Sequence, residues 1–175
     1  MSIRDQIRIL VKDERLAFLP PLLASDPIER CIFLAEPVKE IILGPWADED
    51  TEIRGKRLRA FLDQFTTGGT IEACLVPHLA KNAYLGRLKY PRDEVWDIRS
   101  RDPKPGIRVF GRFAEQDTFI ALRWAKRAPC GDKYSREWRN QIKQCKADWR
   151  NLFPAYCALS GENLHDYISR NVIHN

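Results

Sequence analysis

Arginine side chains recur at alternate positions along three neighbouring segments in the second half of the chain, and two phenylalanines lie among them. Successive side chains of a strand point to opposite faces, so every second residue shares a face. A guanidinium forks onto phosphate and stacks on bases, and a phenyl ring offers a base a stacking surface. We therefore expect one sheet face to bind nucleic acid. Its residues are Arg99, Arg101, Arg108, Arg112 and Arg123, with Phe110 and Phe119.

The segments that carry these residues have the pattern of strands joined by tight turns. Residues 94–101, 106–114 and 118–126 alternate apolar and polar side chains, and the linking segments D-P-K-P-G and E-Q-D have turn chemistry. Residues 70–76 are a candidate fourth strand. The sequence thus predicts an α+β fold with an antiparallel sheet of about four strands and helices packed on one face.

A long amphipathic helix is expected over residues 135–153, before Pro154. We expect its apolar stripe to cover the apolar sheet face, although a one-residue bulge at Gly111 would exchange part of the assignment. The stripe consists of Trp138, Ile142, Cys145, Trp149 and Leu152. The sheet face consists of Trp96, Ile98, Ile107, Val109, Gly111, Phe113, Ile120, Leu122 and Trp124.

A second, basic stripe follows the same helix, and its Arg139 and Lys143 extend the predicted nucleic-acid surface. The stripe consists of Arg136, Arg139, Lys143, Lys146 and Arg150, about 120° from the apolar stripe by helical geometry. An alternative remains open. The sheet arginines can instead pair with carboxylates or with a partner protein, while Phe110 and Phe119 pack beneath the first third of the chain.

The rest of the chain is read as helical segments around this sheet. Ser2 is expected to cap a helix over residues 3–17, a shorter helix is expected over 27–35, and an acidic segment starts a helix that ends at Gly68. We therefore divide the chain into an N-terminal helical extension (1–46), an α+β domain (47–154) and a C-terminal tail (155–175). The trio His165-Asp166-Tyr167 either forms an acid–base site or caps a turn locally.

Charge is distributed unevenly along the 175 residues. Residues 1–55 carry 7 basic and 11 acidic side chains, whereas residues 56–175 carry 22 basic and 13 acidic ones. Such an asymmetry favours an anionic partner for the second part. No apolar run approaches the roughly 20 residues of a membrane span, and charges interrupt the N-terminal segment. The sequence therefore predicts a cytoplasmic protein with no membrane partner.

Cysteine and histidine are too scattered to form a metal centre. The five cysteines form no C-x-x-C pair, and only three histidines are present. The chain also has no P-loop, G-x-S-x-G or H-E-x-x-H motif. We therefore expect no metal and no cofactor, and reduced cysteines that mostly fill core positions.

The order of the motifs resembles the RelE/HigB-like toxin superfamily, in particular its phage-derived HigB-type subgroup. The resemblance covers roughly residues 58–150. A helix ending F-L-D-Q-F is followed by V-W-D-I-R-S, I-R-V-F-G-R-F and T-F-I-A-L-R-W-A-K-R, and then by a helix. It implies a small antiparallel sheet flanked by helices, metal-independent cleavage of mRNA with or without the ribosome, and an acidic antitoxin-like partner protein.

Metal-free RNA cleavage needs a base near the 2′-hydroxyl, cations around the developing phosphorane charge and an acid for the 5′-oxygen. Arg108 and Arg99 match arginines of the family's strands, and Lys126 with Arg127 match the basic end of its last strand. Tyr134 is a candidate acid or base because it lies close to these residues in the sequence; Asp132 is the other. The alternative is a non-catalytic module on the same fold that binds nucleic acid or protein.

Overall fold

A computed structural model describes residues 1–77, 82–127 and 135–174. A single eight-stranded sheet runs through it in the order β1-β2-β7-β6-β5-β4-β3-β8. The strands are β1 (Ala17–Phe18), β2 (Cys31–Leu34), β3 (Ile71–Cys74), β4 (Leu85–Arg87), β5 (Trp96–Ser100), β6 (Ile107–Glu115), β7 (Thr118–Lys126) and β8 (Val172–His174). The helices are α1 (Ile3–Lys12), α2 (Glu36–Leu43), α3 (Glu49–Thr66), a 3-10 turn at Pro91–Asp93, α4 (Arg136–Leu152) and α5 (Leu164–Tyr167).

The centre of the sheet is the predicted meander. β5 pairs with β6, and β6 with β7, in antiparallel register. The expectation of a four-stranded antiparallel sheet is nevertheless wrong. The sheet is mixed, because β2 pairs with β7, and β3 with both β4 and β8, in parallel. The candidate strand in residues 70–76 exists as β3, but β4 separates it from the meander.

The first third of the chain supplies part of the sheet, so the expectation of a purely helical extension is also wrong. The helix expected over residues 27–35 is replaced by β2, a short apolar segment whose pairing partner β7 lies far along the chain. A run of this length does not distinguish strand from helix by periodicity. Pro37 lies in the first turn of α2, where a missing N–H costs no hydrogen bond, and thus begins a helix instead of ending one.

The longer helices begin at residues whose side chains cap them. Ser2 caps α1, Asp48 caps α3 and Ser135 caps α4, each accepting a hydrogen bond from an N–H of the first turn. The helix expected over residues 3–17 ends early, at Lys12. The predicted α4 is confirmed, with its five-residue apolar stripe buried. None of the described helices is both long enough and apolar enough to cross a membrane.

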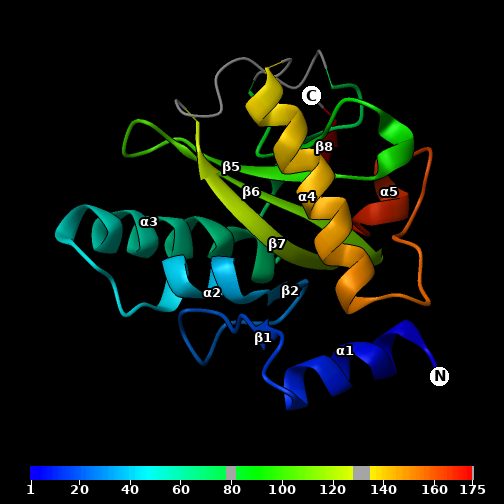
Figure 1. The fold of residues 1–175 in the computed structure, drawn as a ribbon, viewed down its shortest axis with the longest axis horizontal. Coiled ribbons are helices and arrows are strands. Elements are labelled where there is room, and N and C mark those ends of the chain that lie inside the picture. The colour runs from blue at the N-terminus through cyan, green and yellow to red at the C-terminus, as the bar shows by residue number, and fades with distance from the viewer. Residues whose placement is uncertain (78–81, 128–134, 175) are drawn as a thin grey trace.

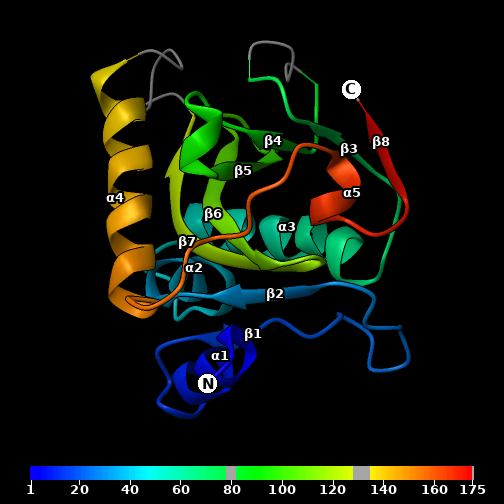
Figure 2. The same ribbon diagram turned by 90° about the vertical axis from the view of Figure 1, so that its right-hand side faces the viewer.

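Helices cover both faces of the sheet, which corrects the expectation that they pack on one face. Figure 2 shows α4 on one side of the sheet and α3 on the other, and Figure 1 shows α4 crossing β5, β6 and β7. The apolar face of β5 and β6 packs against α3 and α2, not against α4. The α4 stripe covers the opposite face, around Phe110, Ile120 and Leu122.

A β-bulge in β7 explains part of the wrong face assignment. Phe110 pairs with Arg123 and Gly111 with Ala121, which leaves Leu122 as the extra residue. The bulge shifts the alternation, so that Trp124 and Ala121 pack toward α3 while Leu122 packs toward α4. Phe110 and Phe119 are consequently buried on opposite faces, with no exposed surface. They do not form a shared stacking surface.

The C-terminal segment folds back along the sheet. β8 extends the sheet beyond β3, and Tyr167 of α5 packs against Trp96 and Phe113 with ring centroids 4.7 and 5.4 Å away. Asp166 accepts hydrogen bonds from the backbone N–H groups of Glu162 and Asn163. The local capping interpretation of the His165-Asp166-Tyr167 trio is thus confirmed for its aspartate.

Candidate nucleic-acid interface

Two arginines meet side by side at one end of the central strands. The register of β5 and β6 pairs Arg99 with Arg108. Asp97 lies two residues before Arg99 and so shares its face. Its Oδ1 accepts a hydrogen bond from Arg99 Nε at 2.8 Å, and its Oδ2 lies 3.8 Å from Arg108 Nη1. One carboxylate therefore compensates two guanidinium groups, which would otherwise repel each other across the strands.

This group of charges is largely withdrawn from solvent. Asp97 has no exposed surface, and Arg99 is 8% exposed. Burial lowers the pKa of Arg108 to about 10; Asp97 opposes the shift, while Arg99, Arg127 and Arg101 add to it. We call Arg99, Arg101, Arg108 and Arg127 the arginine cluster. Arg99 and Arg108 share the carboxylate of Asp97.

The loops at the ends of the strands bring the remaining two members of the arginine cluster to this site. Arg101 directly follows β5, and Arg127 directly follows β7, where its backbone N–H donates to Gly106 O at 2.7 Å. The Arg127 guanidinium also lies 5.3 Å from the centre of the Trp138 ring on α4. The cluster thus includes residues that follow β5 and β7, and it contacts the first turn of α4 through Trp138.

Two facing atoms at the centre of the site have no hydrogen-bond partner. Within residues 1–77, 82–127 and 135–174, Asp97 Oδ2 and Arg108 Nη1 are both buried and, although they face each other at 3.8 Å, neither has a hydrogen-bond partner. Buried polar atoms are normally hydrogen-bonded, so each such exception calls for an explanation. A guanidinium N–H in this state is a donor with capacity for an anionic oxygen.

Gly86 on β4 makes room for the Arg99 side chain. A Cβ at this position would lie 2.3 Å from Arg99 Nη2 and 3.2 Å from Asp97 Oδ1. Arg99 therefore crosses β4 where no side chain stands in its way. The sequence alone did not single out Gly86, because nothing in it indicates which strand lies beside β5.

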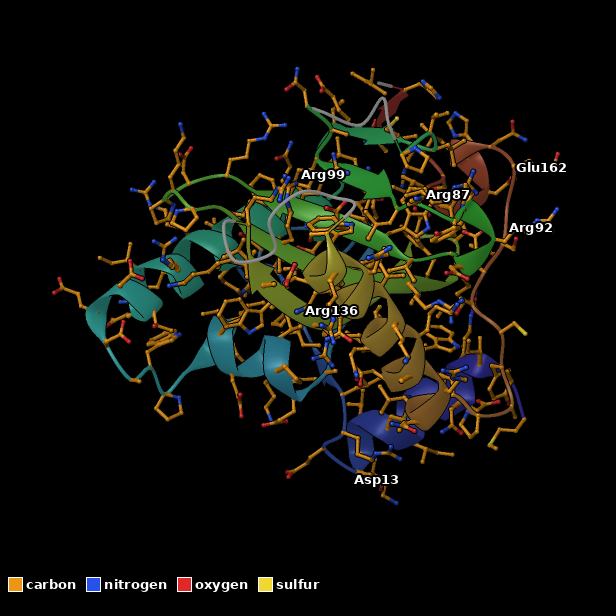
Figure 3. All side chains as sticks on the ribbon, turned by 45° about the horizontal axis from the view of Figure 1, so that its top comes forward. Asp13, Arg87, Arg92, Arg99, Arg136 and Glu162 are labelled. Carbon is orange, nitrogen blue, oxygen red and sulfur yellow. The ribbon has the colours of Figure 1, made fainter. Side chains whose placement is uncertain are left out.

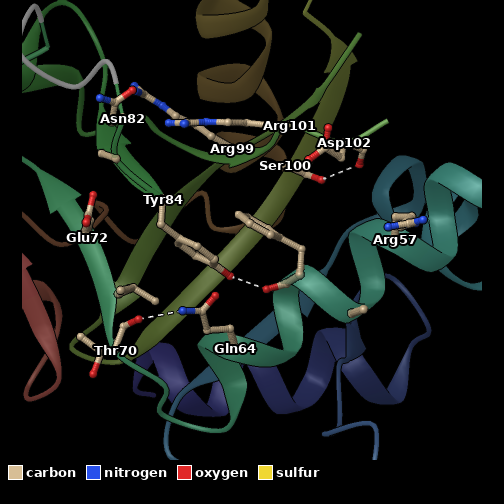
Figure 4. Close-up of a pocket in the computed structure, with 14 residues that line it drawn as sticks. Arg57, Gln64, Thr70, Glu72, Asn82, Tyr84, Arg99, Ser100, Arg101 and Asp102 are labelled. Carbon is tan, nitrogen blue, oxygen red and sulfur yellow. Dashed lines mark hydrogen bonds between the residues drawn. The ribbon is translucent and has the colours of Figure 1, made fainter. Parts of the chain in front are cut away.

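A cavity of about 660 Å³ adjoins the arginine cluster, and Figure 4 shows it between β5 and α3. Arg99 and Arg101 lie at one end, and the cluster and the cavity therefore share these two residues. The Phe61 and Tyr84 rings stack with centroids 4.4 Å apart at an interplanar angle of 17°. The lining comprises Arg57, Ala60, Phe61, Gln64, Thr70, Ile71, Glu72, Asn82, Ala83, Tyr84, Arg99, Ser100, Arg101 and Asp102.

Three basic residues of the predicted surface have other partners. Arg112 donates to Asp93 O at 2.7 Å and lies 5.2 Å from the centre of the Trp149 ring. Arg123 pairs with Asp148 of α4 at 2.8 Å. Lys126 points to the α3 side, where its Nζ lies 3.4 Å from Asp50. For Arg123 the alternative prediction, pairing with a carboxylate, describes the contact that is found, whereas Arg112 contacts a backbone oxygen and an aromatic ring.

The remaining predicted residues divide between the surface of α4 and undescribed positions. Arg139 and Lys143 are exposed and, with Arg136, border a shallow depression of about 400 Å³. Arg99 and Arg136 are both visible from the viewing direction of Figure 3. Tyr134 and Asp132 lie outside the described residues. Among the described residues, no group of three or more His, Cys, Asp or Glu side chains is arranged to hold a metal.

Sequence reasoning found the paired arginines but missed the cavity. Asp97 lies on the same strand face as Arg99, and the register that pairs Arg99 with Arg108 brings its carboxylate near both guanidinium groups. Nothing in the sequence indicates that Arg57 and Gln64 of α3 line the cavity, because that depends on which strand end α3 approaches. No family model, curated protein or solved structure matches the chain.

Proposed function

We propose that this protein binds RNA through the arginine cluster. The observation that carries the proposal is the pair Arg99 and Arg108, which share one buried carboxylate, with Arg99 also lining the cavity. Arg108 Nη1 is buried without a hydrogen-bond partner within the described part of the chain. A phosphate oxygen would satisfy this donor.

The surroundings favour a polyanion over a single small anion. Arg136, Arg139 and Lys143 add exposed cations on α4, the helix whose Trp138 ring contacts Arg127 of the cluster. Residues 56–175, which contain all of these groups, hold 22 basic and 13 acidic side chains. Clustered cations of this kind are the electrostatic footprint of nucleic-acid binding. A cytoplasmic location, where RNA and ribosomes are present, is part of the proposal.

Cleavage of RNA is the second candidate. It is supported by the pairing of Arg99 with Arg108, since both match arginines of the family's strands and Arg108 is the first choice for stabilising the phosphate. Within the described residues of the site, however, two groups able to transfer a proton are already hydrogen-bonded. Asp97 accepts from Arg99, and the Tyr84 hydroxyl donates to Phe61 O at 2.8 Å. Binding is therefore the function that the geometry supports best.

The proposal is tested by fluorescence anisotropy with a labelled single-stranded RNA of about 12 nucleotides, within the usual site size of single-strand binding modules. We expect Arg99→Gln to weaken binding about tenfold, the loss of one charge-assisted hydrogen bond. Arg4→Gln is the matched control, because Arg4 pairs with Glu115 at the exposed surface away from the cluster. Equal loss in the two variants, or no binding by the wild-type protein, would contradict the proposal.

Cleavage is tested separately by primer extension on mRNA from a cell-free translation reaction that contains the purified protein. Discrete new 5′ ends that disappear with Arg108→Gln would establish an endoribonuclease. Intact mRNA, together with RNA binding, would leave binding as the whole function. A protein that ignores RNA but co-purifies with an acidic protein at fixed stoichiometry would identify the basic surface as a protein-binding one.

A further inference from the structure

The cavity beside the arginine cluster has a size and lining that a generic phosphate-binding surface does not need. Its volume of about 660 Å³ falls within the roughly 300–1,000 Å³ of ordinary small-ligand sites. Cations lie at one end, where Arg99 and Arg101 belong to the cluster, and Arg57 of α3 lines it as well. Aromatic and aliphatic side chains, among them Phe61 and Tyr84, form another part of the cavity lining. The cavity is therefore amphipathic, with its charge next to the proposed RNA phosphates.

The aromatic wall is held in place by its own contacts. Tyr84 stacks on Phe61 at 4.4 Å, and its hydroxyl donates to the Phe61 backbone oxygen. Burial raises the pKa of Tyr84, so this hydroxyl keeps its proton and its bond. Ala60, Ile71 and Ala83 complete the apolar lining. A preformed flat wall of this kind suits a planar ring, because little side-chain entropy is lost on binding.

Polar side chains stand where they can contact the edge of such a ring. Gln64 Nε2 donates to Thr70 O at 2.7 Å, which fixes the orientation of the amide. Figure 4 shows the Gln64 amide oxygen turned away from Thr70 and the Asn82 amide beside the Arg99 and Arg101 guanidinium groups. Amide side chains of Asn and Gln are common readers of base edges.

We propose that this cavity holds one unpaired nucleotide of the bound RNA, with its base against the Phe61–Tyr84 wall and its phosphate on Arg99 and Arg101. The inference rests on the proposed RNA binding. A base within a duplex would have to leave its stack to enter, at a cost of a few kcal/mol. The protein therefore discriminates in favour of single-stranded RNA.

The test fills the cavity without removing any existing contact. Ala60 is an exposed residue of α3 at the cavity wall, so Ala60→Trp adds bulk there. The matched control is Ile53→Trp, also exposed on α3, but outside the cavity lining. Anisotropy titrations use one labelled RNA strand, alone and annealed to its complement. We expect Ala60→Trp to weaken single-strand binding about tenfold, the contribution of one stacked base, while duplex binding and the Ile53→Trp variant stay near wild type.

A second variant tests the reading of the base edge. Gln64→Ala should change the relative affinities for oligo(A), oligo(U) and oligo(C) by several-fold while leaving the salt dependence unchanged, since no charge is lost. The thermal unfolding midpoint of each variant confirms that it folds. Equal changes for all three oligomers would show that Gln64 does not contact the base.

The outcomes separate this inference from the proposed function. If Ala60→Trp binds single strands as the wild type does, while Arg99→Gln still weakens binding, the nucleotide site is refuted and RNA binding stands. If the wild-type protein binds no RNA, the proposed function fails first. A free nucleoside monophosphate has the same chemistry as the proposed occupant. Adenosine monophosphate that binds more tightly than the RNA would assign the cavity to a small molecule instead.

Discussion

At the scale of single residues, the site depends on an aspartate that holds two arginines together. Asp97 has no exposed surface and contacts Arg99 and Arg108 from one face of the sheet. Removing one partner of a buried ion pair leaves an uncompensated charge, which is far more costly than losing a surface pair. Asp97 is therefore a positioning residue for the arginine cluster, and the guanidinium groups are the ones that would contact phosphate.

The position of Arg99 is tested by adding a methyl group and not by removing a charge. Gly86→Ala would place a Cβ 2.3 Å from Arg99 Nη2, so the guanidinium must move. Because the moved guanidinium is the hydrogen-bonded partner of the buried Asp97, we expect the free energy of unfolding to fall by about 1–3 kcal/mol. RNA affinity should fall about tenfold. Gly86→Ala that binds RNA like the wild type would show that the position of Arg99 does not matter.

At the scale of elements, one buried arginine joins three segments far apart in the sequence. Arg30, which precedes β2 and is 2% exposed, stacks on Phe65 of α3 with Cζ 5.4 Å from the ring centre. Its two Nη atoms donate to four backbone oxygens at 2.8–3.3 Å. The acceptors belong to Phe65, Gly69, Arg170 and Asn171. Arg30 thereby holds the approach to β8 against the end of α3.

Loss of this arginine should destabilise the protein and loosen β8. Hydrogen bonds from charged groups contribute about 1.5–3 kcal/mol each, so Arg30→Met should lower the free energy of unfolding in urea by about 3 kcal/mol or more. Arg30→Lys should not restore it, because an ammonium cannot span the four acceptors. Amide exchange should quicken at Ile71, whose N–H donates to Asn171 O. Arg170→Met, which removes an exposed partner of Glu29, is the control and should cost under about 1 kcal/mol.

The C-terminal segment adds a pH dependence in the alkaline range. The Tyr167 hydroxyl donates to Glu94 at 2.7 Å, and burial together with this bond raises the pKa of Tyr167 to about 12. Between about pH 10 and pH 12 the unfolded chain loses this proton while the folded chain keeps it. The stabilisation is therefore complete below about pH 10 and is lost as the pH rises toward 12.

Urea unfolding at several alkaline pH values tests this account of Tyr167. We expect the wild-type free energy of unfolding to fall over this range, and that of Tyr167→Phe to fall less steeply. Burial also raises the pKa of Tyr84, but both proteins contain Tyr84, so the difference in slope belongs to Tyr167. Parallel slopes would show that the Tyr167 hydroxyl titrates normally in the folded protein.

The elements that the sequence predicts well are those whose signals are local. Turn residues between the strands predict the meander, and the apolar stripe with Pro154 predicts α4, almost to the residue. The sheet faces were misassigned because β6 and β7 bury side chains on both sides, and because a bulge at Leu122 shifts the alternation. β2 and β8 were missed because each is stabilised by parallel pairing with a distant strand, which leaves no pattern in a segment of three or four residues.

At the scale of the whole molecule, the arginine cluster and the cavity lie at the same end of the sheet, because they share Arg99 and Arg101. The paired Arg99 and Arg108 were predictable from strand register, but the cavity was not, because α3 and the segment before β4 approach it from elsewhere in the chain. Exposed cations also lie on α4, whose Trp138 ring contacts Arg127 of the cluster. The proposed RNA-binding site therefore depends on several elements, α3, the segment before β4, and α4, that pack around β5.

The salt dependence of RNA affinity is the direct test of whether the arginine cluster contacts the RNA backbone. For single strands, log K falls by about 0.7 per decade of salt for each phosphate contact, so three or four contacts predict a slope of about −2 to −3. The measurement is anisotropy with a single-stranded RNA over a potassium chloride series, for the wild type and for Arg99→Gln. The account predicts that Arg99→Gln reduces the slope by about 0.7. A slope that is unchanged in Arg99→Gln would show that the arginine cluster does not contact the RNA backbone.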